Sequence, residues 1–387
     1  MTPSEAEQLI ARFGSPLYVY DADGVRAAYR RFEAAFGRHP RTTIHYAIVC
    51  NKNRYLVRML GALGAGIHAN TPGDAFAALS AGIPAERIVY SGTNLDANDL
   101  RFVLDRGIRM NLDSLDQLRD ATSMGTSIPS VGLRFLIDDE HRGNRIGVTR
   151  DELPEALAIA KKAGTKIAGL HMYAGTNTRR AGRFVECLDR LIDASRLLPD
   201  LAFVDIGGGF GIAYDDGEPE LDLETLGQAA AERVASLGAD IELVCEPGRS
   251  IVGPFGSLLV TVVSVKERGG RRYVGVDSTV GNVVVPSVYH SRHRIDAVHG
   301  GEPLGMPTDV CGNTTHSRDF LGRDLRLPEV KRGDPLVLRD VGAYGYAMSS
   351  HFLNRPRPAE VVLDGGTAHL TTRRETFEDL LATQVQA

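Results

Sequence analysis

The segment Ile44-His45-Tyr46-Ala47-Ile48-Val49 is a short apolar run, and a helical pattern follows it from Tyr55 to Leu63. The same alternation of an apolar run with an amphipathic segment continues to about residue 250. Later apolar runs lie at Gly66–Ala69, Ile88–Tyr90, Val131–Ile137, Ile167–Met172, Phe203–Ile206 and Ile241–Cys245. Strands that alternate with helices predict parallel β/α units. Around eight such strands fit a (β/α)8 TIM-type barrel, an α/β fold that carries its chemistry at the carboxyl ends of the strands.

The sequence changes character after about Gly253. Runs rich in β-forming residues are now separated by Gly and Pro, with little helical periodicity; they lie at Ser257–Val265, Arg272–Val276, Val283–Val285 and Pro335–Leu338. This texture predicts an antiparallel β-domain. We therefore predict a ligand-binding barrel at residues 24–253 and a C-terminal β-domain at residues 254–387.

Composition and charge exclude several classes of protein. The 387 residues are 43% hydrophobic and 24% charged, which is ample for large buried cores. The net charge is -5, the pI is near 6.1 and no basic stripe is present, so nucleic acid is not an expected partner. No apolar stretch is long enough to span a bilayer, and we expect a cytoplasmic protein without a membrane partner. The scattered cysteines predict neither disulfides nor a metal site.

Two motifs end predicted strands with residues suited to an anion. Asp205-Ile206-Gly207-Gly208-Gly209-Phe210-Gly211 contains a glycine triplet, whose missing side chains let backbone N–H groups approach a phosphate. The triplet fits a tight strand-to-helix turn equally well. Cys245-Glu246-Pro247-Gly248-Arg249 places a carboxylate and a guanidinium at another strand end, where a surface salt bridge is the alternative interpretation.

These motifs match a known family. With His45-Tyr46-Ala47-Ile48-Val49-Cys50-Asn51-Lys52-Asn53 and Asp340-Val341-Gly342-Ala343-Tyr344-Gly345, they make the chain resemble the diaminopimelate/ornithine decarboxylases, pyridoxal phosphate enzymes of the alanine-racemase-like fold. The resemblance runs from Phe13 to Gly365. It implies that residues 1–23 join the C-terminal β-domain to complete the active site. It also implies a small-molecule substrate and a homodimer with shared active sites.

The resemblance assigns the cofactor contacts to particular residues. They are Tyr173, Thr176, Gly208, Gly209, Glu246, Arg249 and Tyr344. Glu246 would pair with the pyridine nitrogen, which strengthens the ring as an electron sink, and most of the others would bind the phosphate. Tyr173 replaces the histidine that stacks on the ring in the family; its flat face could still stack, and ordinary packing is the alternative. Thr176 keeps a hydroxyl expected near the phosphate.

The most consequential departure lies at Val49. In the family pattern Tyr-Ala-x-Lys-Ala-Asn-x-Asn, this position holds the lysine that forms a Schiff base with pyridoxal phosphate and exchanges it for the substrate amine. Valine can do neither. Lys52 follows on the predicted loop and is a candidate replacement, although an extended chain would displace it by about 10 Å. The alternative for Lys52 is a solvated loop residue.

Other departures fall where the family performs its chemistry. His68 replaces an aspartate, Thr315 replaces the cysteine that crosses the dimer interface, and His316 replaces the acid that contacts the distal substrate amine. Val285 stands where diaminopimelate enzymes often have a carboxylate-binding arginine, which disfavours diaminopimelate as the substrate. Groups near the substrate end would include Tyr289, Arg292 and His293.

Three functions are compatible with this pattern. The first is a divergent decarboxylase-like enzyme that acts on an amino acid or amino-acid-like carboxylate and binds pyridoxal phosphate without the usual lysine. Its proton-transfer candidates are Lys52, His68 and His316, with Thr315 beside them. The second is decarboxylation or proton transfer on a phosphorylated or carboxylated substrate without pyridoxal phosphate. The third is a catalytically silent binding or regulatory homologue.

Overall fold

The computed structural model describes residues 2–125, 127–137, 145–215, 217–286 and 292–385. The chain divides into two compact units. Unit 2, the barrel unit, comprises Arg26–Ile212 and Pro219–Ile251. Unit 1, the β-unit, comprises Met1–Val25, Ala213–Glu218 and Val252–Ala387. The N-terminal residues thus group with the C-terminal part of the chain, as does the short segment Ala213–Glu218.

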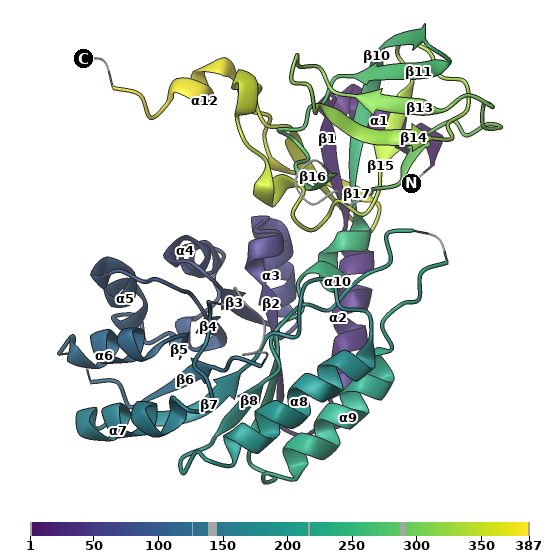
Figure 1. Cartoon of the computed structure of the whole chain (residues 1–387). Coiled ribbons are helices and arrows are strands. Elements are labelled where there is room, and N and C mark those ends of the chain that lie inside the picture. The colour runs from purple at the N-terminus through teal and green to yellow at the C-terminus, as the bar shows by residue number, and fades with distance from the viewer. Residues whose placement is uncertain (1, 126, 138–144, 216, 287–291, 386–387) are drawn as a thin grey trace. The chain divides into compact units, whose positions relative to one another are not determined.

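The barrel unit contains a closed sheet of parallel strands (Figure 1). They are β2 (Thr42–Ala47), β3 (Gly66–Ala69), β4 (Ile88–Tyr90), β5 (Arg109–Leu112), β6 (Ser130–Arg134), β7 (Lys166–His171), β8 (Phe203–Asp205) and β9 (Glu242–Cys245). Each strand pairs with the next, and β9 returns to pair with β2 through Ile44 and Cys245, which closes the barrel. The predicted (β/α)8 fold is confirmed.

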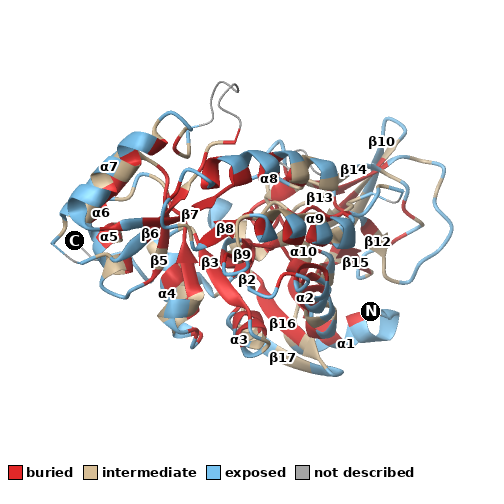
Figure 2. Ribbon diagram, turned by 90° about the horizontal axis from the view of Figure 1, so that it is seen from below, coloured by how far each residue is buried: buried red, intermediate tan, exposed pale blue. Residues whose placement is uncertain are grey.

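Helices surround the barrel strands. They are α2 (Ala22–Phe36), whose first turn belongs to the β-unit, α3 (Arg54–Ala62), α4 (Pro72–Ser80), α5 (Ala97–Leu104), α6 (Leu115–Ser123), α7 (Leu153–Ala163), α8 (Ala181–Ser195), α9 (Leu223–Ala235) and the short α10 (Arg249–Val252), with a 3-10 turn η2 at Ala85–Arg87. Their sequences are amphipathic, so each helix buries an apolar face and exposes a polar one. Figure 2 shows this division, with buried strands inside and exposed outer helix faces.

Two details of the barrel differ from the sequence prediction. β5 was not among the predicted runs, because its four residues include Arg109 and Asn111 and form no apolar run. β2 ends at Ala47, two residues before Val49, and a 3-10 turn η1 (Ile48–Cys50) follows. Tyr46 Oη donates a hydrogen bond of 2.8 Å to the carbonyl oxygen of Asn51, which holds this turn against the strand end.

The β-unit is built on a sheet of mixed direction. Its strands are β1 (Leu17–Asp21), β10 (Gly256–Arg268), β11 (Arg271–Val276), β12 (Ile295–Ala297), β13 (Thr308–Cys311), β14 (Phe320–Leu325), β15 (Pro335–Leu338), β16 (Ala359–Asp364) and β17 (Thr367–Thr372). The main path runs β14-β13-β11-β10-β1-β16-β17, and β15 pairs with both β10 and β12. Most pairs are antiparallel, as predicted, but β1 with β16 and β11 with β13 are parallel. Parallel partners cannot be joined by a tight hairpin, and in both pairs at least one other strand lies between the partners along the chain.

Helix α1 (Pro3–Phe13) covers one face of this sheet. Ala6 and Leu9 pack in one apolar cluster with Leu17, Val19 and Val361 of the sheet. The remaining elements are α12 (Phe377–Leu381) and the 3-10 turns η3 (Gly253–Phe255), η4 (Tyr346–Met348) and η5 (Phe352–Asn354). The strand predicted at Val283–Val285 is wrong: the carbonyl of Thr279 accepts hydrogen bonds from the N–H groups of Asn282 and Val283, so the chain turns there.

Among the described residues, no helix combines the length and the apolar character that a membrane crossing requires.

Candidate active site

A buried polar cluster lies at the carboxyl ends of the barrel strands. Glu246 directly follows β9, and its Oε2 lies 3.1 Å from Nε2 of His171, the last residue of β7. Nε2 of His68, in β3, lies 3.5 Å from the same oxygen. Asp205 ends β8, and its Oδ1 accepts a hydrogen bond of 2.9 Å from the N–H of Gly207. All these side chains are buried, so the cluster lies in the interior of the barrel.

Several atoms of this cluster have no hydrogen-bond partner within the described part of the chain. They are Nδ1 and Nε2 of His68, Nδ1 of His171, Oε1 of Glu246 and Oδ1 of Asn111. A buried polar atom without a partner costs about 1–3 kcal/mol. A core built only for stability would not be expected to leave so many in one place, and we interpret the cluster as the floor of a polar ligand site.

Burial shifts the protonation of this cluster toward neutral forms. It raises the pKa of Glu246 to about 8 and, together with the charge of Glu246, raises the pKa of Asp205 well above its usual value. Burial lowers the pKa of His171 to about 4 and that of His68 well below its ordinary value. At neutral pH the Glu246 carboxyl group therefore holds a proton, and both imidazoles are neutral.

The glycine triplet forms a turn that only glycine can make. Gly207 and Gly209 have φ angles of 66° and 92°. A Cβ atom on Gly207 would overlap the carbonyl oxygen of Met172, and one on Gly209 would overlap that of Gly175. The N–H groups of Gly208 and Gly209 find no acceptor among the described residues. The turn is thus required by packing and also presents backbone donors to an anion.

Tyr173 and Thr176 lie beside this turn. Their hydroxyl groups are 2.8 Å apart, and the Tyr173 ring is 3.3 Å from the position of a Cβ on Gly209. The guanidinium carbon of Arg134 lies 5.6 Å from the centre of the Tyr173 ring, a distance at which a cation interacts with an aromatic face. Tyr173 is 40% exposed, so its ring can contact a ligand.

Val49 and Arg249 belong to neighbouring turns. A Cβ on Gly248, the residue before Arg249, would lie 3.0 Å from Sγ of Cys50, the residue after Val49. Val49 is 38% exposed and lies in the turn η1, so the prediction that it ends the strand is wrong. Arg249 begins α10, directly after the Glu246 strand end. Val49, at the position of the missing lysine, and Arg249 are therefore on adjoining segments.

The lysine side chains are all exposed to solvent. The chain has six, all in described segments: Lys52, Lys161, Lys162, Lys166, Lys266 and Lys331. Lys52 lies on the loop between η1 and α3, as predicted, and its charge lowers the pKa of Asp74, which burial raises overall. Because each lysine is exposed, the barrel interior contains no buried amine.

The remaining predicted residues belong to the β-unit. Thr315 and His316 are exposed on a loop held by Asp319, whose carboxylate accepts a 2.9 Å hydrogen bond from the N–H of Thr314. The His316 ring packs edge-on at 5.3 Å from that of Phe352. Tyr344 is half-buried in another loop. Of the other positions near the predicted substrate end, Val285 and His293 are buried, Arg292 is exposed, and Tyr289 lies outside the described residues.

Sequence reasoning gave no functional role to four residues of the site, namely His171, Asn111, Arg134 and Asp205. Asn111 donates hydrogen bonds of 3.1 Å to Ser91 Oγ and 3.4 Å to Asp205 Oδ2. Arg134 ends β6 and its charge acts on the carboxyl of Glu246. Asp205 was visible as the residue before the glycine turn. The available signal was a polar residue within or at the end of a short strand, which is unusual in a barrel core.

The cluster also has the composition of a metal site, which the sequence spacing did not predict. Ligand atoms of His171, Asp205 and Glu246 all lie within 4.8 Å of one another. Imidazole and carboxylate groups are suitable ligands for a divalent transition metal. Glu246 could not bind such an ion and pair with a ring nitrogen through the same oxygen at the same time.

A known family model covers this barrel and its strand-end residues. Residues 22–253 match the family model described as "Pyridoxal-dependent decarboxylase, pyridoxal binding domain". The chain belongs to this family.

Its relatives include enzymes named diaminopimelate decarboxylase. That of Methanothermobacter thermautotrophicus is 34% identical over 405 residues, covering 98% of this chain and 94% of the relative. That of Aquifex aeolicus is 32% identical over 393 residues, with coverages of 96% and 92%. The solved structure of diaminopimelate decarboxylase from Helicobacter pylori complexed with L-lysine has a TM-score of 0.90 at 29% identity, covering 97% of this chain and 98% of that one. The family and fold expected from the sequence are thereby confirmed.

Proposed function

We propose that this protein is a decarboxylase-like enzyme that binds pyridoxal phosphate without a covalent bond to lysine and acts on an amino acid or amino-acid-like carboxylate. One observation carries the proposal: the ring-nitrogen acid Glu246 is retained, buried, with Oε1 unpartnered within the described part of the chain, while Val49 replaces the lysine. Membership in the pyridoxal-dependent decarboxylase family supports the choice of cofactor.

The residues of the glycine turn and of α10 suit a phosphate group. The unpaired N–H groups of Gly208 and Gly209 supply donors, and Arg249 supplies positive charge at the adjoining strand end. Thr176 adds a hydroxyl beside the turn. Family resemblance adds Tyr344. With several donors available, the affinity for the cofactor does not depend on a bond to lysine.

The Glu246 carboxyl group suits a pyridine nitrogen. Burial raises its pKa to about 8, so at neutral pH it carries a proton that it can transfer to the ring nitrogen. The resulting ion pair would be stronger than a neutral contact, because both partners are desolvated. Bound pyridoxal phosphate supplies an electron sink for the bond that breaks at the substrate α-carbon.

Proton transfer requires a substitute for the lysine. His68 is the interior candidate, because its imidazole is neutral at pH 7 and its ring nitrogens have no hydrogen-bond partner among the described residues. Lys52, Thr315 and His316 are exposed, and family resemblance is the reason to keep them as candidates. We assign the interior role to His68 and keep the other three as candidates for the substrate side.

The proposed substrate is an amino acid or amino-acid-like carboxylate, and two positions of the chain bear on its side chain. The relatives are named for diaminopimelate, but Val285 is buried and apolar at the position where those enzymes often have an arginine. His316 replaces the acid that would contact a distal amine. We therefore propose a substrate that lacks the distal amino-acid group of diaminopimelate, in a homodimeric cytoplasmic enzyme whose second subunit contributes the Thr315 segment.

Release of CO2 tests this proposal. Protein saturated with pyridoxal phosphate is incubated with a panel of amino acids labelled in the α-carboxyl group, and labelled CO2 is measured. We expect release that Glu246→Gln abolishes. Equal release by protein stripped of the cofactor would favour the cofactor-independent alternative. No release from any substrate would favour the silent homologue.

A further inference from the structure

The loop that carries Tyr344 has a backbone conformation that needs external support. Tyr344 has a φ of 62° and Asp340 a φ of 59°, in the left-handed region that residues with side chains rarely adopt. Such conformations persist only where the surrounding structure holds them. We call residues 340–351 the tyrosine loop.

The start of the tyrosine loop is held within the β-unit by Arg294 and by close backbone packing. Nε and Nη2 of Arg294 donate hydrogen bonds of 3.1 and 3.0 Å to Oδ2 of Asp340. The N–H of Gly342 donates a 3.1 Å hydrogen bond to the carbonyl of Gly253. A Cβ on Gly342 would overlap the carbonyl oxygen of Val252, so the loop is fixed where it begins.

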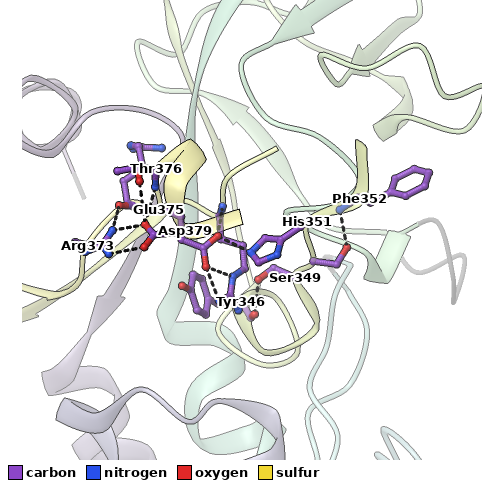
Figure 3. A network of polar contacts seen from close by, with 11 residues as sticks. Tyr346, Ser349, His351, Phe352, Arg373, Glu375, Thr376 and Asp379 are labelled. Carbon is purple, nitrogen blue, oxygen red and sulfur yellow. Dashed lines mark hydrogen bonds and ion pairs between the residues drawn. The ribbon is translucent and has the colours of Figure 1, made fainter. Parts of the chain in front are cut away.

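The end of the tyrosine loop is held by one carboxylate from the C-terminal segment. Oε2 of Glu375 accepts hydrogen bonds from Nε2 of His351 at 2.7 Å and from the N–H of Arg357 at 2.9 Å. Oε1 accepts from Nε and Nη2 of Arg357 at 2.8 and 2.5 Å. The Glu375 side chain is only 13% exposed, so these contacts are shielded from water. Figure 3 shows Glu375 and His351 within this network.

Arg357 links Glu375 to the middle of the tyrosine loop. Its guanidinium lies 5.5 Å from the centre of the Tyr346 ring, and that ring packs edge-on against Tyr18 at 5.7 Å. Ser349 Oγ donates a 2.7 Å hydrogen bond to the carbonyl of Tyr346. Glu375 therefore acts on the tyrosine loop both at His351 and, through Arg357, at the residue two positions after Tyr344.

We propose that Glu375 is a positioning residue that fixes Tyr344 for ligand binding. The inference rests on the proposed function in one respect, that Tyr344 contacts the cofactor phosphate. Glu375 acts through the tyrosine loop and not by contact with the ligand. The segment between β17 and α12, which contains Glu375, thereby helps to set the affinity for the cofactor.

Matched variants of the same segment test the inference. Glu375→Gln keeps the shape of the side chain but removes the charge that Arg357 and His351 share. His351→Ala removes one donor to Glu375 from the exposed end of the network. Asp379→Asn is the control, because Asp379 pairs with Arg373 at 2.5 and 2.7 Å and caps α12 without contacting the tyrosine loop.

The dissociation constant for pyridoxal phosphate is the first measurement. We expect Glu375→Gln to weaken binding about tenfold, the equivalent of ~1.4 kcal/mol, and His351→Ala to weaken it less. Asp379→Asn should stay within about twofold of the wild type. Unchanged affinity in Glu375→Gln, or an equal loss in Asp379→Asn, would overturn the inference.

A double-mutant cycle separates positioning from general destabilisation. If Glu375 acts through Tyr344, Glu375→Gln adds nothing to the loss caused by Tyr344→Phe. Losses that multiply would overturn the inference.

Hydrogen–deuterium exchange gives a readout that needs no cofactor. Peptides from residues 340–351 should exchange faster in Glu375→Gln than in Asp379→Asn, with barrel peptides unchanged. Equal exchange in the two variants would contradict a role for Glu375 in holding the loop. A wild-type chain that binds no pyridoxal phosphate would instead overturn the proposed function and the ligand role of Tyr344, while the exchange result would still decide what Glu375 holds.

Discussion

Nε2 of His171 lies 3.1 Å from Oε2 of Glu246, whereas Oε1 of the same carboxyl group has no hydrogen-bond partner in the described part of the chain. One oxygen is fixed by the barrel and the other remains available. A buried carboxyl group in this state can accept one further donor or give up its proton to a base. This free oxygen is the atom that the proposed function assigns to the ring nitrogen of the cofactor.

Glu246→Gln should reduce the dependence of stability on pH. Burial raises the pKa of Glu246 to about 8 from 4.5, so the folded protein retains a proton that the unfolded chain loses, and stability falls as pH rises toward 8. His171 has the opposite effect only below its unfolded value of 6.5, because burial lowers its pKa to about 4. Above pH 6.5, the titration of Glu246 lowers the free energy of unfolding by up to ~1.4 kcal/mol per pH unit.

Urea unfolding between pH 6.5, the ordinary pKa of histidine, and pH 8, near the pKa of Glu246, measures this slope. The variant should show a smaller slope than the wild type. Glu242→Gln is the control, since Glu242 lies on the same strand and pairs with Arg109 at 2.9 Å outside the cluster. The same slope in Glu246→Gln as in the wild type would show that Glu246 titrates elsewhere.

Val49→Lys should restore a covalent bond to pyridoxal phosphate. The introduced amine would lie on the turn that adjoins the Arg249 segment. We expect borohydride to trap the cofactor on the peptide that carries the substitution, with a new absorbance band before reduction. The adduct should persist when Lys52→Ala is added. Trapping on the Lys52 peptide instead would place the cofactor aldehyde away from the turn.

Gly209→Ala should destabilise the barrel and weaken anion binding. The φ of 92° is unfavourable for alanine, and its Cβ would overlap the carbonyl of Gly175, so we expect a loss of about 1–3 kcal/mol in urea unfolding. Gly182→Ala is the matched control, because nothing lies within 4 Å of its Cβ position inside α8. That substitution should be neutral or stabilise by about 0.5–1 kcal/mol. Equal effects of the two substitutions would contradict the assigned role of the turn.

The sequence predicted the architecture because the apolar runs have clear periods. Ile44–Val49 and Ile167–Met172 are long enough to be identified as strands, whereas Arg109–Leu112 is not, because its side of the barrel interior is filled by Asn111. The mixed direction of the β-unit sheet depends on pairings between distant segments such as Leu17 with Ala359. No local pattern specifies such pairings.

The sequence predicted the site residues that belong to a motif, but it did not predict the properties that arise from the surrounding structure. Glu246 and the glycine triplet stand out as residues at strand ends, and the structure places Glu246 beside His68 and Gly208 close to the carbonyl oxygen of Glu246. The raised pKa of Glu246 and the unpartnered atoms of His68 arise from burial by several strands, which the sequence does not encode locally. The contacts by which Glu375 supports the tyrosine loop likewise join two segments that share no sequence motif.

Intact mass after borohydride reduction tests most directly whether the cofactor is bound without a covalent bond. The wild-type protein is saturated with pyridoxal phosphate, binding is verified by equilibrium dialysis, and the sample is reduced, denatured and weighed. We predict bound cofactor before reduction and no added mass afterwards. Added mass that maps to the Lys52 peptide, or the absence of binding in dialysis, would contradict the account.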